Sequence, residues 1–339
     1  MSRQGFVTLG DRMSKDARSP GFDLGQFLPV RLILDLLRRL GLAGRGLVVL
    51  VPYVWLLMFF LIPFAIVLKI SFAEADIAIP PYTALFDWAE GGMLTVKLNF
   101  ASFMFLLTDS LYAVAYLNSL KIAFVSTVLC LLLGYPMAYG IAKAPTSWRG
   151  PLLMMIILPF WTSFLIRVYA WIGILKPEGL LNNFLIWLGV IDTPLQILYT
   201  DVSIYIGVVY SYLPFMILPL YANLEKHDAS LLEAAIDLGC RPWRAFLKVT
   251  LPLSMPGVIA GSMLVFIPAV GEFVIPRMLG GTDSLMIGRV LWDEFFLNRN
   301  WPVASAVAVA LLVVLVIPIV IFQRYQARET GALAAMSNR

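Results

Sequence analysis

Long apolar stretches separated by short polar segments run through most of this sequence. An α-helix rises 1.5 Å per residue, so about 20 consecutive apolar residues cross the hydrocarbon core of a bilayer. Six stretches reach that length, at residues 47–68, 119–142, 152–175, 202–224, 253–276 and 302–322. The pattern predicts an all-α membrane protein with about six transmembrane helices.

Three shorter segments have patterns of their own. Residues 30–40 place Arg31, Asp35 and Arg38 on one helical face with leucines largely opposite, which predicts an amphipathic helix on the membrane surface. Residues 180–191 are apolar but too short to span, so we expect an interfacial helix. Residues 283–298 are expected to form a surface helix. The chain should therefore consist of an N-terminal extension at 1–46, a transmembrane domain at 47–323 and a tail at 324–339.

The positions of Lys and Arg predict the orientation in the membrane. With six spans both termini lie on one side. The first 46 residues, the segments after the second and fourth spans, and the tail together hold 17 of the 25 Lys and Arg residues. Because basic residues concentrate in cytoplasmic loops, we expect both termini in the cytoplasm.

Acidic residues are concentrated on the opposite side. Twelve of the 21 Asp and Glu residues lie in or beside the loops on that face. A negatively charged mouth would attract a cationic solute. The alternative is that these acids merely accompany the basic residues inside, and the sequence leaves both interpretations open.

Composition excludes several kinds of chemistry. Charged residues make up only 14% of the chain and apolar residues 60%, which indicates lipid rather than nucleic acid as the partner. His227 is the single histidine, so a histidine-based catalytic or metal site is excluded. Cys130 lies within a span and Cys240 in a loop, so no disulfide or thiol-ligated metal is expected. The chain also lacks a Gly-x4-Gly-Lys-Ser/Thr phosphate loop. We therefore expect a non-catalytic chain without a cofactor of its own.

The segment 228–258 carries local signals for two short helices. Asp228 can cap a helix, and residues 229–238 have high helix propensity. Gly239 tolerates the positive φ of a helix C-terminus, and Pro242 can open a second helix because its missing N–H is not needed there. The small residues Ala234 and Ala235 would suit close docking into the groove of a partner.

This segment resembles the cytoplasmic loop shared by the permeases of ABC importers. The family pattern is Glu-Ala-Ala, three residues, Gly, nine residues and Ile-x-Leu-Pro, and here Val249 replaces the isoleucine. In that family the loop is the coupling helix that docks on the ATPase. The resemblance implies a type I importer permease bundle, with the coupling residues Glu233, Ala234, Ala235, Asp237, Gly239, Leu251 and Pro252.

A wider resemblance concerns the polyamine permeases of this family. It is carried by residues 79–83, 158–171 and 265–276, covers nearly all of 47–322 and is closest to the putrescine-type subunit. It implies a permease domain in the bacterial inner membrane that moves putrescine, or spermidine, from periplasm to cytoplasm. The implied partners are a dimer of ABC ATPases that bind ATP and Mg, a second homologous permease and a periplasmic polyamine-binding protein. That protein could dock through Asp283, Asp293 and Glu294.

Two ionisable residues within predicted spans are candidates for the solute pathway. An acid in a span is expensive, so Glu272, which follows Pro268 and Gly271, should face a cavity or a partner. The structural alternative pairs it with Arg277 or Arg167. For Arg167 itself we favour a structural ion pair, because a guanidinium in the path would repel a cation.

Aromatic residues near Arg167 could form a gate or a cation–π surface for an alkylammonium group. The candidates are Phe160, Trp161, Tyr169 and Trp171. The alternative is that they anchor the span at the membrane interface.

Other functions are less consistent with the sequence. A secondary transporter acting alone would usually show an inverted repeat. A membrane-embedded enzyme would need a cluster of catalytic groups. An importer permease for another solute, such as sulfate, molybdate, ferric iron or thiamine, would share the coupling loop and remains open.

Overall fold

The computed structural model describes residues 45–88, 94–282 and 284–337. The predicted N-terminal helix at 30–40, with the rest of the extension up to residue 44, lies outside this range. The chain divides into two compact units, Met1–Ala65 and Ile66–Arg339. The first predicted span is a continuous helical run of α2 (Arg45–Leu56), the π-helical η3 (Leu57–Leu61) and α3 (Ile62–Ser71).

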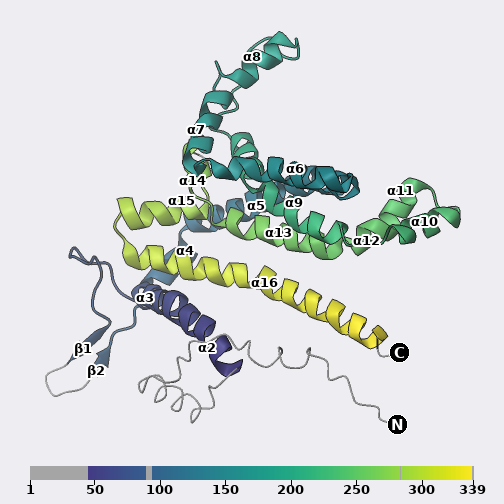
Figure 1. The fold of residues 1–339 in the computed structure, drawn as a ribbon. Coiled ribbons are helices and arrows are strands. Elements are labelled where there is room, and N and C mark those ends of the chain that lie inside the picture. Colours follow the sequence, from purple (N-terminus) through teal and green to yellow (C-terminus); the bar gives the residue numbers. More distant parts are fainter. Residues whose placement is uncertain (1–44, 89–93, 283, 338–339) are drawn as a thin grey trace, which may run out of the picture. The chain divides into compact units, whose positions relative to one another are not determined.

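Three helices form the centre of the second unit. These are α5 (Ser110–Lys143), α9 (Asp201–Leu224) and α13 (Met255–Val270), which pack against one another (Figure 1). Small residues allow close approach: a Cβ on Gly134 would come within 3.0 Å of Met216 Cγ, and one on Gly261 within 2.9 Å of Met216 Sδ. Helices within a bilayer associate mainly by such close packing.

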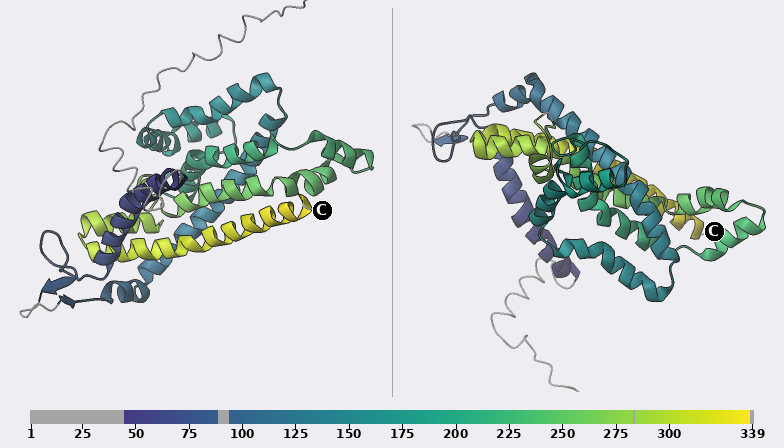
Figure 2. Two further views of the ribbon diagram at one scale, coloured as in Figure 1. Left: turned by 60° about the horizontal axis from the view of Figure 1, so that its bottom comes forward. Right: turned by 90° about the horizontal axis from the view of Figure 1, so that it is seen from above.

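Helix α16 (Trp301–Ser337) runs alongside α13 (Figures 1 and 2). It also packs against α4 (Ala101–Thr108), a short helix that the sequence analysis missed. The Tyr116 hydroxyl of α5 donates a 2.7 Å hydrogen bond to the Val307 carbonyl. Helix α16 continues through the predicted boundary between transmembrane domain and tail at residue 323.

The third predicted span is broken, contrary to the expectation of one straight helix at 152–175. Helix α6 (Thr146–Ile157) passes into the 3-10 turn η4 (Leu158–Trp161), and α7 (Phe164–Leu175) then leaves at 90°. Pro159 supplies no backbone N–H, and Thr162 and Ser163 are extended with ψ of 152° and 135°. The predicted interfacial helix follows as α8 (Leu180–Trp187), with Trp187 exposed.

The fifth predicted span, 253–276, is also interrupted. Its regular part is α13, which bends by 63° from the preceding helical segment 242–253 and ends at Val270. Residues 271–273 are not helical, and α14 (Val274–Met278) begins after them. By length and composition, the described residues contain four complete spans, or six if each bent pair counts as one.

The end of the bundle opposite to α10 and α11 carries short elements (Figure 1). They include the antiparallel strands β1 (Phe86–Trp88) and β2 (Leu94–Val96), helix α15 (Ile287–Trp292) and the π-helical η6 (Asp293–Leu297). The predicted surface helix therefore exists, but one face of α15 is buried. The backbone N–H of Ile287 donates a 2.7 Å hydrogen bond to Ser119 Oγ on α5.

Candidate functional site

The predicted coupling segment forms a helical hairpin that projects beyond the ends of α9 and α13 (Figures 1 and 2). It consists of α10 (Ala229–Asp237) and α11 (Pro242–Ala245), with Pro242 at the first position of α11. Asp228 Oδ1 accepts a 3.0 Å hydrogen bond from the Ser230 backbone N–H and so caps α10. Hydrogen bonds from the backbone and side chain of Ser230 stabilise the carboxylate and hold the pKa of Asp228 below its ordinary value.

Gly239 ends α10 in the manner predicted from the sequence. Its φ is +83°, its N–H donates to the Ile236 carbonyl at 2.8 Å, and the N–H of Cys240 donates to the Ala235 carbonyl at 3.1 Å. These two bonds form a Schellman motif, which requires a left-handed residue at the helix end. Apart from its two chain neighbours, no residue has an atom within 4 Å of a Cβ placed on Gly239, so only the backbone conformation demands glycine.

The hairpin presents the predicted coupling residues on its surface. Glu233, Ala234, Asp237 and Gly239 are exposed, and Ala235 is half-buried. Leu238 beside them is 90% exposed. An apolar residue this exposed, with small neighbours on a projecting helix, fits a surface that another protein covers.

The base of the hairpin is bonded to the bundle. Leu251 is half-buried and packs in the core between α5 and α9, whereas Pro252 is exposed. The Ser254 hydroxyl, one helical turn beyond, lies 2.9 Å from Tyr135 Oη on α5. A displacement of the hairpin would therefore be transmitted to α5.

A cavity of about 500 Å³ lies where the two broken spans meet α9. Five aromatic residues contribute to its lining, namely Phe160, Phe164, Tyr212, Phe215 and Phe273. Two charged residues also line it, Arg167 from α7 and Glu272 from the break after α13. Phe160 and Glu272 were predicted from the sequence to line the solute pathway, whereas the other four aromatic residues were not. The sequence offers only a weak signal for these residues: Tyr212 and Phe215 lie near Pro214 along the chain, and Phe273 directly follows Glu272.

Glu272 is 8% exposed and is held by three hydrogen bonds. Its Oε2 accepts from Tyr212 Oη at 2.5 Å, and its Oε1 accepts from the backbone N–H groups of Val274 at 3.0 Å and Ile275 at 3.4 Å. The carboxylate thus occupies the beginning of α14. The alternative that Glu272 pairs with Arg277 is wrong, because Arg277 binds Asp293 at 3.3 Å.

Arg167 makes no ion pair among the described residues, so the structural pair expected for it is absent from this structure. Its guanidinium carbon lies 5.1 Å from the ring centre of Phe160 and 5.8 Å from that of Phe164. Its Nε and Nη1 atoms are buried and have no hydrogen-bond partner. Buried donors of this kind are rare and require an explanation.

The remaining aromatic candidates do not line this cavity. Trp161 is 72% exposed and Tyr169 63% exposed. Trp171 packs edge to face against Tyr210 on α9, with ring centres 5.3 Å apart. Of the four aromatic residues proposed from the sequence, only Phe160 is brought together with Glu272.

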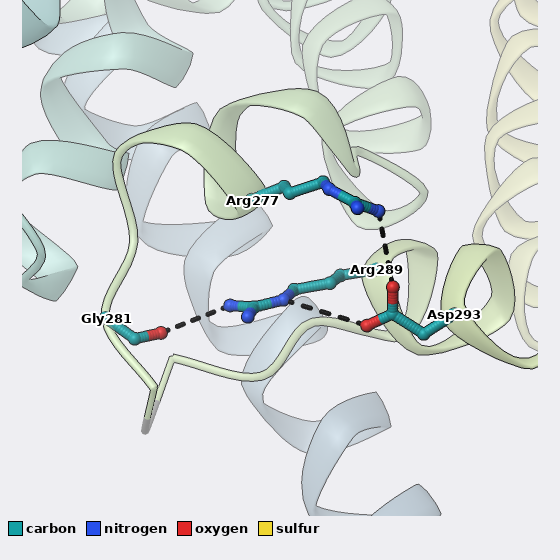
Figure 3. A network of polar contacts seen from close by, with 4 residues as sticks. All are labelled: Arg277, Gly281, Arg289 and Asp293. Carbon is teal, nitrogen blue, oxygen red and sulfur yellow. Dashed lines mark hydrogen bonds and ion pairs between the residues drawn. The ribbon is translucent and has the colours of Figure 1, made fainter. Parts of the chain in front are cut away.

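At the opposite end of the molecule, Asp293 joins two arginines (Figure 3). It lies 3.3 Å from Arg277 and 4.0 Å from Arg289, and Arg289 also donates to the Gly281 carbonyl at 3.2 Å. Glu294 accepts a 2.9 Å hydrogen bond from Tyr112 Oη. Asp293 and Glu294, selected for docking of a partner, are therefore both engaged within the chain, and Asp283 lies outside the described residues.

Comparison with known families identifies the class of protein. Residues 35–331 match the family model of the "binding-protein-dependent transport system inner membrane component". The chain therefore belongs to this family, the membrane permease subunits of ABC importers, and is a multi-pass inner-membrane protein without catalytic chemistry of its own.

Several individual proteins of this family are similar to the chain over most of its length. The chain is 41% identical over 288 residues to the spermidine/putrescine transport system permease protein PotB of Haemophilus influenzae, covering 83% of this chain and 93% of the relative. It is 40% identical to PotB of Escherichia coli, covering 80% and 93%. It is also 31% identical to the molybdenum transport system permease protein ModB of Mycobacterium bovis, covering 67% and 84%.

Two solved structures have the same fold as this chain. A bacterial ABC transporter involved in import of the acidic polysaccharide alginate superposes with a TM-score of 0.61 at 18% identity, covering 88% of this chain and 99% of that one. A bacterial alginate ABC transporter in complex with an alginate pentasaccharide-bound periplasmic protein gives a TM-score of 0.63 at 16% identity, covering 88% and 98%. This likeness defines the fold and leaves the solute open.

Proposed function

We propose that this chain is the membrane permease subunit of an ATP-driven importer that carries polyamines from the periplasm to the cytoplasm, putrescine first and spermidine as the alternative. The observation that carries the proposal is the carboxylate of Glu272 in an aromatic-lined cavity. A carboxylate with nearby ring faces suits an alkylammonium group, which forms both ion pairs and cation–π contacts. The names of the PotB relatives support the same solutes.

ATP hydrolysis takes place on separate ATPase subunits, which bind ATP and Mg and dock on α10. The exposed face with Glu233, Ala234 and Asp237 supports this assignment. A second homologous permease completes the membrane part of the complex. Both termini lie in the cytoplasm, which puts α10 on the side where ATP is available. A reporter active only in the periplasm, fused after Arg339, should stay silent.

A periplasmic polyamine-binding protein delivers the solute to the opposite end of the molecule. Asp293 and Glu294 remain candidates for this contact, but their partners within the chain reduce the charge they can offer. The Asp293 side chain is 33% exposed, so its network (Figure 3) borders the surface. Charge reversal of Glu294 should weaken binding-protein-stimulated ATP hydrolysis if this face is used.

Import of an oxyanion is the second candidate function. The unpartnered donors of Arg167 would suit an anion, and one relative is a molybdenum permease. The buried carboxylate of Glu272 in the same cavity opposes an anion, because like charges in a low-dielectric site repel strongly.

The test is uptake by the complete complex in proteoliposomes. Wild-type complex with its ATPase, second permease and binding protein should take up labelled putrescine or spermidine in an ATP-dependent manner and should leave molybdate outside. The purified single chain should hydrolyse no ATP. Uptake of molybdate without uptake of either polyamine would reject the polyamine assignment in favour of an oxyanion.

A further inference from the structure

Arg167 keeps hydrogen-bond donors unused at the wall of the cavity. Its buried Nε and Nη1 atoms have no partner, and its guanidinium carbon lies 5.1 Å from the ring centre of Phe160 and 5.8 Å from that of Phe164. Aromatic rings contact the flat face of a guanidinium, whereas its N–H groups point outward in its plane. The two rings therefore hold the Arg167 side chain in place without supplying an acceptor.

Glu272 brings the opposite charge to the same cavity, and aromatic rings link it to Arg167 along the wall. The ring of Phe160 packs edge to face against Phe215, with centres 5.3 Å apart, and Phe215 lies 6.1 Å from the ring centre of Tyr212. The Tyr212 hydroxyl in turn donates to the Glu272 carboxylate. Of the residues that line this cavity, only Arg167 and Glu272 are charged. The cavity thus offers one positive group, one negative group and apolar ring surface.

We propose that this cavity also accepts ω-amino acids, which carry an ammonium group and a carboxylate at opposite ends of a methylene chain. The ammonium group pairs with Glu272, the carboxylate accepts from Arg167, and the methylene groups lie against the rings. Glu272 accepts three hydrogen bonds in the structure, and a carboxylate has about four acceptor positions, so one is open to the ammonium group. The inference rests on the proposed function, because it uses the same cation site, and it adds a zwitterionic class of solute.

A zwitterion matches both charges, whereas the other solutes match one. A polyamine pairs with Glu272 and leaves the donors of Arg167 unused. An oxyanion pairs with Arg167 and is repelled by Glu272. Because the formal charges of the two side chains cancel, a solute without net charge adds none to a cavity in which an unpaired charge is costly.

Equilibrium binding to the complete membrane complex tests the proposal. The complex of both permeases and the ATPases is placed in nanodiscs without the binding protein, whose own selectivity is thereby removed from the measurement. Labelled γ-aminobutyrate is the probe, and n-butylamine and butyrate are competitors that each lack one of its charged groups. We expect γ-aminobutyrate to bind about tenfold more tightly than either competitor, because each of them loses one charge-assisted hydrogen bond.

Two cavity variants assign the charges to the two ends of the ligand. R167Q should weaken the binding of γ-aminobutyrate about tenfold and should not weaken that of n-butylamine, which has no group for Arg167. E272Q should weaken both ligands. K176Q is the matched control, because it removes an exposed cation that follows the last turn of α7, outside the cavity. It should change neither affinity.

The proposal would be overturned by a wild-type complex that binds γ-aminobutyrate no more tightly than n-butylamine, or not at all. An unchanged affinity of R167Q for γ-aminobutyrate would overturn it as well. The comparison of ligands requires no variant, so it decides the matter even if R167Q does not assemble. Absence of polyamine uptake by the wild-type complex in proteoliposomes would instead refute the proposed function, so the two failures are distinct.

Discussion

The α10–α11 hairpin is held by hydrogen bonds between residues close in sequence, whereas the cavity around Glu272 is assembled from distant segments. In the hairpin, Asp228 bonds Ser230 and Gly239 bonds Ile236. The cavity takes its lining from η4 and α7, from α9 and from the break after α13. The hairpin surface is exposed, and its proposed role is to contact another protein. The cavity is lined mainly by apolar side chains around one buried carboxylate, and its proposed role is to receive a cationic solute.

The two regions should therefore respond differently to substitution. At the end of α10, backbone conformation is the sensitive quantity, because a side chain placed on Gly239 would meet open space. In the cavity, the sensitive quantity is the balance of charges, since an ion pair strengthens as the local dielectric falls. Substitutions that alter only backbone strain or only charge can separate these contributions.

Gly239→Val should have the largest effect. A left-handed conformation costs a residue with a side chain roughly 1–2 kcal/mol, and a β-branched residue is disfavoured further. We expect α10 to lose its C-terminal cap and ATP-dependent uptake to fall about tenfold or more, while the chain still inserts into the membrane. Uptake and ATPase activity of the complete complex measure the effect.

Gly140→Val is the matched control. Gly140 on α5 has an ordinary helical conformation, and a Cβ there also meets open space. This variant should transport normally. Normal transport by Gly239→Val too would mean that the Schellman motif is dispensable and that the hairpin does not transmit the work of the ATPase.

The sequence predicted the hairpin correctly because its signals are local. Asp228, Gly239 and Pro242 each act on neighbouring backbone groups, so their consequences follow from residue type and order. The breaks in the third and fifth spans were not predicted. Pro159 and Gly271 permit a break, but similar residues, such as Pro136 in α5, lie inside a continuous helix.

The lining of the cavity could be predicted only in part, because it depends on the two breaks in the helices that were not predicted. Glu272 was selected because an acid in a span is costly wherever the helix lies. The bond from Tyr212 joins α9 to the break after α13, and the position of Arg167 depends on the 90° bend before α7. No periodic pattern in either segment encodes that juxtaposition.

Glu272→Gln should have the next largest effect and addresses charge in the cavity. Glutamine keeps one acceptor oxygen for the N–H groups at the beginning of α14, and its amide N–H can donate to the Tyr212 hydroxyl oxygen, but it cannot form an ion pair. A pair of unit charges at about 4 Å is worth about 4 kcal/mol at an effective dielectric of 20, before desolvation is subtracted. We expect near-normal assembly with polyamine uptake reduced several-fold. Full uptake by this variant would exclude a role for the charge in passage, and failure to assemble would make it structural.

Tyr212→Phe should have a smaller effect on the same site. It removes one of the three hydrogen bonds to Glu272 and leaves the ring in the cavity. Loss of one bond of about 1 kcal/mol should change the KM for uptake by about twofold to fivefold. Tyr210→Phe, one helical face away against Trp171, is the control and should leave the KM unchanged. Equal behaviour of the two variants would argue against a role of Tyr212 in orienting the carboxylate.

The smallest effect is expected at the beginning of the hairpin, where Asp228 caps α10. Asparagine caps helices as well as aspartate does, whereas alanine does not. Asp228→Asn should thus behave like wild type at neutral pH, and Asp228→Ala should lower uptake by about a half or less. Amide hydrogen exchange in the first turn of α10 should rise only in the alanine variant. Faster exchange in the asparagine variant would show that charge, rather than the cap, is required.

The pH dependence of this cap follows from the lowered pKa of Asp228. Because the carboxylate binds its proton more weakly in the folded hairpin, its contribution is present above the unfolded value of about 3.9 and is lost as the pH falls through the folded value. Between about pH 5 and pH 8 the cap should therefore be insensitive to pH. Exchange of the Ser230 amide across that range measures this directly. A change near neutral pH would show that another group, rather than the Asp228 carboxylate, controls the stability of the cap.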